Sequence, residues 1–536
     1  MYNAGINRVT RAPRDSLLEK VPEFVRTNAT PANLIGLGGG IFAIFCLLAL
    51  PASQNWNIRL PLYLVLVVWT LLRPRIALYL LPVAIPWGSL DAITLAGLNL
   101  NSADILVVLL AISWLMSFTL RPLVGHSQSG PLDREQLFNT PRYLVFAMLA
   151  LLLAMLLSMV TTLSISLSIK EVAKWLEALV ILLLGTQYLR TRREIWTLVI
   201  IICLAAISQA ILGYAQYAFN LGPASFIRDA SLRVYGTFDQ PNPYAGYINM
   251  TLTIALALLL LGRGMAIRTL TGLTVIVLGG AEFLSQSKGG YLALAAALVF
   301  IITVALLHRR VLFSWIIITI LCIIALYLAG LIPGSVFSPI LQKAGLVNLS
   351  FAYPTTENYA NSERLAHWVA GLLMFRDHPL IGVGIGNYAS AYPKYAQGIF
   401  VVPLGHAHNY YINIAAEAGI IGLAGLLAFL IAAFVAGGRS LRTISKQCKQ
   451  AMEQRAKPRA GIQVAGARAT LERLRQLTNE RALAIGLLAA LISVCVHNVV
   501  DDLYVHSMTS LFVLLLVMLI RLDVGVSTKR TNSSRV

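Results

Sequence analysis

The sequence predicts an all-α polytopic membrane protein, and three observations lead to that fold class. Of the 536 residues, 57% are hydrophobic and only 12% are charged, whereas soluble proteins carry about a quarter charged residues. The mean hydropathy is +0.74, and long apolar runs recur along the chain. Because backbone polar groups must pair internally inside a bilayer, such runs predict membrane-spanning helices.

The apolar runs predict about 14 transmembrane helices. The runs at 59–72 and 75–88 are short and could form one kinked or re-entrant unit, so the expected range is 12–14. The predicted spans are 33–51, 59–72, 75–88, 103–120, 142–162, 171–189, 194–218, 244–262, 268–285, 290–307, 312–332, 410–436, 482–500 and 504–520.

The basic residues predict how these spans are oriented. With the N-terminus in the cytoplasm, the inner segments hold about 32 of the 42 Lys and Arg residues, as the positive-inside rule requires. We therefore expect both termini to be cytoplasmic. About 32 mostly polar residues precede the first span, so we expect no cleavable signal peptide.

This orientation divides the chain into seven parts: a cytoplasmic N-terminal segment 1–32, transmembrane helices 1–11 within 33–332, an outer (periplasmic) loop 333–409, transmembrane helix 12 at 410–436, a basic cytoplasmic loop 437–481, transmembrane helices 13–14 at 482–520, and a cytoplasmic tail 521–536.

Two of these loops carry further expectations. The basic loop 437–481 is expected to be a solvated connector, and a surface helix beside anionic lipid headgroups is the alternative. In the outer loop, apolar spacing from Leu365 to Phe375 predicts an amphipathic helix that caps a cavity or lies on the membrane.

The composition argues against several other classes of protein. The net charge of +19 follows from the inner-loop bias, so we expect membrane lipids and not nucleic acid as the partner of these charges. The five cysteines show neither a disulfide framework nor metal-ligand spacing. The glycine-rich stretch 382–388 lacks a preceding strand, which argues against a nucleotide loop. We expect no metal and no cofactor.

Polar residues that are hard to explain structurally fall at the outer ends of the spans. Taken singly, each could be an interfacial or snorkelling side chain. Asn242 also suits a helix cap before Pro243, and Glu282 and Lys288 could pair with each other. The group consists of Arg233, Asn242, Lys288, Arg364, His406, His408, Asn409, His497 and Asp501.

Together these residues predict an outward-facing anion site beside a general base. The predicted spans that begin at 244, 290 and 410 direct their positive N-terminal ends outward, beside Arg233, Lys288 and His408. With Arg364 added, these cations suit a ligand with two or more phosphates. A histidine at a helix N-terminus is biased to stay neutral, as a general base should be.

The chain resembles the O-antigen ligase and polymerase family of membrane glycosyltransferases over roughly residues 170 to 510. The most specific block is His408-Asn409, then nine residues, then Gly419 and, after two more, Gly422. The segments RVYGTFDQPN, SERLAHW, DHPLIGVGIGNY and HNVVDDLY resemble the other blocks of the family, in the same order.

The resemblance implies a metal-independent, glycosyltransferase-C-like enzyme at the periplasmic face of a bacterial inner membrane. Such enzymes transfer a glycan from an undecaprenyl-pyrophosphate carrier to a hydroxyl of a lipid, a glycan or a protein. By this analogy Arg233 and Lys288 hold the pyrophosphate and His408 activates the acceptor. The family commonly has Ser-Arg where this chain has Ser287-Lys288, and a lysine cannot bind a phosphate bidentately.

Two other functions remain open from the sequence. The chain also resembles relatives associated with inorganic-carbon (bicarbonate) transport, and a non-catalytic assembly scaffold is a further possibility. A transporter would place polar groups on broken helices near the bilayer midplane. The spans show few such breaks, and Lys174 and Glu177 in the sixth span are expected to pair with each other.

Overall fold

The computed structural model describes residues 42–50, 55–95, 98–119, 140–228, 231–306, 342, 347–356, 358–456 and 464–524. The chain divides into two units, Met1–Trp69 and Thr70–Val536, and each is treated by itself. The first unit contains most of helix α3 (Trp56–Leu72). All residues of the candidate site lie in the second unit.

Helices form nearly all of the regular structure in the second unit. The only strands among the described residues form two short antiparallel hairpins, in which Ile93 faces Leu100 and Ile227 faces Leu232. The hairpins pair β1 (Ile93–Leu95) with β2 (Leu98–Leu100) and β3 (Ile227–Arg228) with β4 (Ser231–Leu232). The helices are α4 (Arg75–Trp87), α5 (Ser102–Thr119), α6 (Arg142–Ser158), α7 (Ile165–Tyr188), α8 (Arg192–Ala218), α9 (Pro241–Leu261), α10 (Met265–Ser285), α11 (Lys288–Leu306), α14 (Tyr359–Asp377), α15 (Tyr388–Ala391), α16 (Tyr410–Ala456), α17 (Val464–His497) and α18 (Met508–Val524).

The helices agree in position with the predicted spans that fall on described residues. Seven of the described helices are long and apolar enough to cross a membrane, and four shorter apolar helices accompany them. Helix α7 is in neither group, and it carries several charged residues between Lys170 and Glu177. The predicted span 312–332 and most of 33–51 lie outside the described residues, so the count of 14 stays a prediction.

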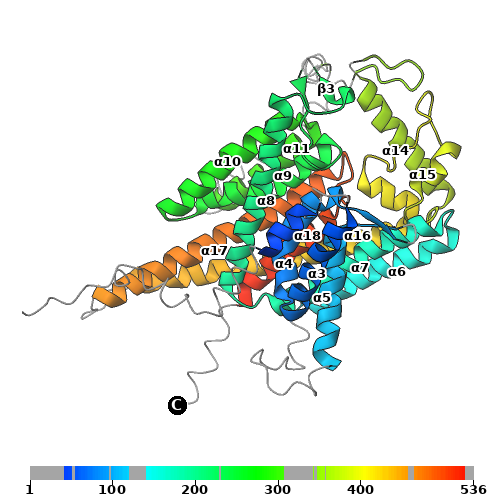
Figure 1. The fold of residues 1–536 in the computed structure, drawn as a ribbon. Coiled ribbons are helices and arrows are strands. Elements are labelled where there is room, and N and C mark those ends of the chain that lie inside the picture. Colours follow the sequence, from blue (N-terminus) through cyan, green and yellow to red (C-terminus); the bar gives the residue numbers. More distant parts are fainter. Residues whose placement is uncertain are drawn as a thin grey trace, which may run out of the picture. The chain divides into compact units, whose positions relative to one another are not determined.

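Helix α17 is the central element of the second unit. It packs against α9, α11, α16 and α18, and Figure 1 shows α9, α10 and α11 side by side above it. In both α9 and α17, 78% of the most apolar window is buried. The turn after α17 is buried too, since His497 is 0% and Asp501 4% exposed, so a site there is partly shielded from water.

The basic segment 437–481 differs from the solvated connector that the sequence predicts. Its described residues are helical, because α16 continues to Ala456 and α17 already begins at Val464. Cys448 and Ala451 of α16 form a buried cluster with Leu474 and Leu477 of α17. These pairs recur at a spacing of three residues, so each extension presents a narrow apolar stripe to the other.

Helix α16 is broken where the outer loop packs against it. Gly419 has φ 65° and ψ −163° inside the helix. The break frees the carbonyls of Ala416 and Glu417, which accept hydrogen bonds from the backbone N–H groups of Val383 (2.9 Å) and Gly384 (2.9 Å). A Cβ atom at position 419 would lie 2.2 Å from the carbonyl carbon of Leu380. The glycine of the His-Asn-x9-Gly block therefore serves as the docking point for the loop at 379–384.

Helix α14 covers the segment predicted to be amphipathic. One face is buried, with a period of three to four residues, and it packs against α16. This buried face carries small and polar side chains, whereas Leu372 is 51% exposed. The residues of the buried face are Ser362, Ala366, His367, Ala370, Gly371 and Met374. Among these mostly small residues, His367 is the one titratable side chain that α14 buries.

Candidate active site

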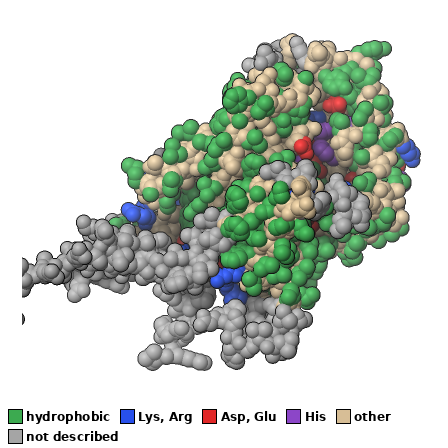
Figure 2. Space-filling view, in the orientation of Figure 1, with side chains coloured by type: hydrophobic (Ala, Val, Ile, Leu, Met, Phe, Trp, Pro, Cys, Tyr) green, Lys and Arg blue, Asp and Glu red, His purple; other side chains and the backbone are tan. Residues whose placement is uncertain are grey.

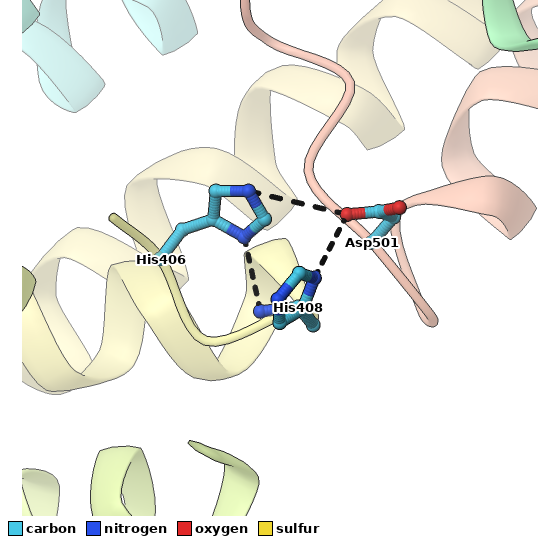
Figure 3. Close-up of side chains that lie close together, drawn as sticks. All are labelled: His406, His408 and Asp501. Carbon is cyan, nitrogen blue, oxygen red and sulfur yellow. Dashed lines mark hydrogen bonds and ion pairs between the residues drawn. The ribbon is translucent and has the colours of Figure 1, made fainter. Parts of the chain in front are cut away.

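His408 and Asp501 form the centre of the candidate site. His408 lies in the loop before α16, and Asp501 lies in the turn between α17 and α18. The Nδ1 of His408 lies 3.2 Å from Oδ1 of Asp501, and Figure 3 shows both histidine rings directed towards this carboxylate. If Nδ1 carries the proton and donates it to Asp501, Nε2 of His408 keeps a lone pair that can accept a proton.

The backbone around His408 is held firmly in an uncommon conformation. His408 has a φ of 51°, a backbone angle that residues other than glycine rarely adopt. The carbonyl of His408 accepts a hydrogen bond from Trp368 Nε1 (3.1 Å). Next to it, Asn409 caps α16, because its Oδ1 accepts the N–H groups of Tyr411 (3.0 Å) and Ile412 (3.1 Å). These contacts fix where the imidazole of His408 points.

His406 supports His408 through the backbone. The N–H of His408 donates to Nδ1 of His406 at 3.1 Å, so Nδ1 must be the unprotonated nitrogen of a neutral His406 ring. Its Nε2–H then faces Asp501 Oδ1 at 4.0 Å. Burial is the main cause that lowers the pKa of His406, with His408 acting in the same direction and Asp502 opposing it.

The carboxylate of Asp501 is strongly favoured in its charged form. Burial alone would raise its pKa, but the hydrogen bond and charge of His408, together with His406 and His497, hold the pKa well below the usual range. The backbone N–H of Asp502 also donates to Oδ1 of Asp501 at 3.0 Å. A permanently charged Asp501 can stabilise an imidazolium on His408 after proton transfer.

A hydrogen-bond chain connects Asp501 to Arg233. Asn242 Nδ2 donates to Asp501 Oδ2 at 2.6 Å, and Oδ1 of Asn242 accepts from Arg233 Nη2 (3.1 Å) and Ser287 Oγ (3.0 Å). Arg233 Nε also donates to the carbonyl of Ser285 at 3.1 Å. Arg233 is thus turned into the protein and does not snorkel, and the predicted residues Arg233, Asn242, Asp501 and His408 form one connected set.

The other predicted residues lie near the hydrogen-bond chain that runs from His408 to Arg233. Lys288 is the exposed first residue of α11, one position after Ser287. Arg364 on α14 and His408 both oppose the rise in the pKa of Glu363 that burial causes. His497 is fully buried at the end of α17, and a Cβ at Gly289 would lie 2.8 Å from its Nε2. Figure 2 shows histidine and acidic side chains gathered in a recess of one face.

His406, His408 and Asp501 are close enough to be tested as metal ligands. One potential ligand atom from each lies within 4.8 Å of the others. However, metal-binding histidines donate their second ring N–H to an acceptor, whereas Nδ1 of His406 faces the N–H donor of His408. That donor places the proton on Nε2 of His406, the atom that faces Asp501. The trio therefore fits a hydrogen-bonded base better than a metal site.

The structure adds a residue that sequence reasoning missed. His367 is buried on α14 with its ring stacked on Tyr392 (4.4 Å between centroids) and edge-on to His408 (5.6 Å). Burial lowers the pKa of His367 to about 4, with His408 and His406 adding to the effect. His367 stands in the SERLAHW block, but only the packing of α14 on α16 shows that it faces His408.

The predicted pairing of Lys174 with Glu177 is wrong. Lys174 forms its ion pair with Glu171 (2.6 Å) and not with Glu177, which is instead hydrogen-bonded to Asp104. Glu282 accepts a hydrogen bond from Asn249 Nδ2 at 3.1 Å. Lys174 thus pairs within α7, whereas Glu177 and Glu282 have their partners on other helices, which sequence spacing does not show.

A polar cavity of about 520 Å³ adjoins His406. It lies between α5, α7, the start of α16 and the turn at 502–507. Its acidic lining residues are Asp104, Glu171, Glu177, Glu417 and Asp502, and its lysines are Lys170 and Lys174. Ionisable residues inside the helices of a membrane protein, such as Lys174 and Glu177 of α7, are candidates for a functional role.

Comparison with known families bears on this arrangement. Residues 273–427 match the family described as O-antigen ligase. This stretch of the chain is therefore similar to O-antigen ligases. The match includes Lys288, Arg364, His406, His408 and Asn409, and it ends before Asp501. No curated protein matches the chain.

The match to O-antigen ligases supports the transfer of glycans as the general class of activity. The apolar helices support a membrane protein. The matched family implies a lipid-linked glycan and an acceptor as partners. Arg233, Asn242 and Asp501 lie outside the matched residues, so their place in the site comes from the geometry alone.

Proposed function

We propose that the chain transfers a glycan from an undecaprenyl-pyrophosphate carrier to an acceptor hydroxyl at the periplasmic face of a bacterial inner membrane. The observation that carries this proposal is the His408–Asp501–Asn242–Arg233 chain, which joins a candidate base to a cation through hydrogen bonds of 2.6 to 3.2 Å. Both termini are then cytoplasmic, and the fold is glycosyltransferase-C-like with about 14 spans.

In this reaction His408 acts as the general base. Nε2 of His408 takes the proton of the acceptor hydroxyl while that oxygen attacks the anomeric carbon of the donor. The bond between the anomeric carbon and the pyrophosphate oxygen breaks, and its electron pair leaves with the carrier. Asp501 stabilises the imidazolium that forms on His408.

The cations assist the departure of the pyrophosphate. Arg233 is oriented by Asn242 and by the carbonyl of Ser285, and Lys288 and Arg364 contribute two further positive charges. The backbone N–H groups at the start of α11 add the positive end of a helix dipole. No metal ion is needed in this scheme, because the developing negative charge is neutralised by side chains and helix ends.

The proposal is tested in cells that lack the gene and express single variants. We expect His408→Ala to abolish the transferred glycan while the protein inserts and accumulates normally. The matched control is His378→Ala, which removes a histidine at the end of α14 and should leave the glycan unchanged. Unaltered glycan in cells that carry only the His408→Ala protein would refute the assignment of His408.

Transport of inorganic carbon is the alternative that the sequence leaves open. A bicarbonate carrier needs an electropositive path, whereas carboxyl groups in the cavity beside His406 outnumber lysines five to two. We therefore favour glycan transfer. Uptake of labelled bicarbonate into vesicles that contain the purified protein would support the alternative.

A further inference from the structure

The cavity beside His406 is not used by the donor site described above. It is lined by the outer ends of α5 and α7 and by residues at the start of α16. Its volume of about 520 Å³ falls in the range of small-ligand pockets. A cavity of this size with so many polar groups needs a polar occupant, because empty protein cavities are normally apolar.

The charges of the cavity are only partly neutralised within it. Lys174 Nζ forms an ion pair with Glu171 (2.6 Å) and donates to the carbonyl of Tyr504 (2.7 Å), so its positive charge is already shared. Asp104 and Glu177 are hydrogen-bonded to each other, which requires one proton between the two carboxyls. The remaining carboxyl groups make the cavity rich in hydrogen-bond acceptors.

The cavity and the donor site lie on different sides of the Asp501 carboxylate. His406 lines the cavity and also faces Asp501 Oδ1, whereas Asn242 and the cation chain bind Oδ2 of the same carboxylate. Asp502, the next residue, lines the cavity as well. A ligand in the cavity would therefore contact His406, the neighbour of His408, while the pyrophosphate lies on the side of Arg233.

We propose that this cavity binds the acceptor, and that it takes a neutral or amino-bearing saccharide end and excludes one that carries a phosphate or a carboxylate. This inference rests on the proposed glycan transfer. Each carboxylate oxygen can accept hydroxyl groups of a sugar, and the two lysines and the amide of Asn413 supply donors. An anionic sugar would be repelled by the same carboxylates. The acceptor is thereby a glycan and not a lipid chain.

Two variants test the lining in different ways. Glu177→Gln replaces one carboxyl group of the lining by an amide at nearly constant volume, and Ala173→Leu fills the cavity without removing a polar group, since Ala173 lines it. Val172→Leu is the matched control, because Val172 is the neighbouring residue on α7 and does not line the cavity. Thermal unfolding of each purified variant establishes that it is folded.

Binding is measured without any donor, by saturation-transfer NMR on full-length protein in nanodiscs. The probes are methyl glycosides of a neutral hexose, a hexosamine and a hexuronic acid. We expect saturation transfer to the first two and none to the uronide, and a loss of at least about fivefold in Ala173→Leu and Glu177→Gln but not in Val172→Leu. Equal binding of the uronide, or unchanged binding in a folded Ala173→Leu protein, would overturn the proposal.

The same proteins separate this inference from the proposed function. In transfer assays with an undecaprenyl-pyrophosphate-linked disaccharide, Ala173→Leu should raise the KM for the acceptor glycoside about tenfold and leave acceptor-independent release of the carrier unchanged. If wild-type protein binds the glycosides but releases no carrier, the proposed function fails and the cavity assignment stands. If it releases carrier but the cavity variants leave acceptor KM unchanged, the cavity assignment fails alone.

Discussion

At the scale of single residues, the arrangement of Asp501 decides what His408 can do. One carboxylate oxygen faces the two histidines, and the other accepts the amide of Asn242. The carboxylate thus orients the base and the group that positions Arg233. A single side chain connects the two halves of the proposed site, and the histidines around it hold its pKa well below the usual range although burial opposes them.

We expect Asp501→Asn to lower kcat by about 10² to 10⁴-fold, because an amide cannot stabilise the imidazolium of His408. The KM for the donor should rise as well, since Asn242 loses its charged acceptor. Steady-state assays of the purified variant give both constants. Asp377→Asn, at an exposed pair with Arg376, is the control, and wild-type kcat in a folded Asp501→Asn protein would contradict the role.

Lys288 is the residue where this chain differs from the family pattern. Lys288→Ala should weaken donor use about 10- to 100-fold, the range for the loss of a charged hydrogen bond, whereas Lys288→Arg should retain or improve it through bidentate contact. The measurement is the KM for the lipid-linked donor. Lys394→Ala, on the same outer loop, should have no effect. A loss with arginine as complete as with alanine would argue against phosphate binding.

His367 predicts a dependence of stability on pH. Its folded-state pKa of about 4 lies below the ordinary value of about 6.5, so the unfolded chain binds more protons between these values. Stability is therefore complete above about pH 6.5 and falls as the pH drops towards about 4. The loss of folding free energy between pH 7 and pH 5 that this residue causes is about 1–2 kcal/mol.

The variant His367→Phe tests this dependence while it keeps a ring against Tyr392. Tyr388 can still donate to the backbone carbonyl of residue 367, as it does at 2.8 Å in the native chain. The drop in Tm between pH 7 and pH 5 should be smaller in the variant than in the wild type. An identical drop in both proteins would show that His367 does not titrate in this range.

At the scale of elements, the kink of α16 links the sequence signature to the site. His408 and Asn409 begin the helix, and Gly419 ends its first segment where the loop 379–384 docks. The same loop carries Gly384 and Gly386 at positive φ, packed against Thr162 and Leu167. Its glycines therefore serve close backbone packing and not a nucleotide.

We expect Gly419→Ala to destabilise the protein by several kcal/mol, because a Cβ there would lie 2.2 Å from Leu380 and the residue has a positive φ. Gly438→Ala in the same helix is the control, since a Cβ at Gly438 meets nothing within 4 Å and alanine favours a helix by about 1 kcal/mol. Thermal unfolding in detergent measures both. Equal stability of the two variants would contradict the docking role.

The sequence was sufficient for the elements but not for their partners. Apolar runs located the described helices from α4 to α11 and from α16 to α18, because each run must bury or face lipid over its length. It was not sufficient for the helical extension of α16 and α17 into 437–481, where only Cys448, Ala451, Leu474 and Leu477 provide an apolar stripe among many charges. Such a stripe is visible only once the two helices are paired.

At the scale of the whole molecule, the predicted orientation of the spans, taken from the basic loops, was what grouped the site residues. It placed Arg233, Lys288, His408 and Asp501 on one side, and the structure connects three of them through Asn242, with Lys288 next to Ser287 of the same network. Contacts between residues as distant as Asn242 and Asp501 could not be derived from spacing. The acidic cavity was missed for the same reason, since α5, α7 and α16 each contribute only part of it.

The most direct test of the account is reconstitution of the purified protein in lipid vesicles with an undecaprenyl-pyrophosphate-linked disaccharide and an acceptor glycoside. Wild-type protein is predicted to release undecaprenyl pyrophosphate and form the transferred glycan in equal amounts, with no change after metal chelation. His408→Ala is predicted to reduce both by at least about 10²-fold. Release and transfer by folded His408→Ala protein at the wild-type rate would contradict the central claim that His408 is the base of a glycan transferase.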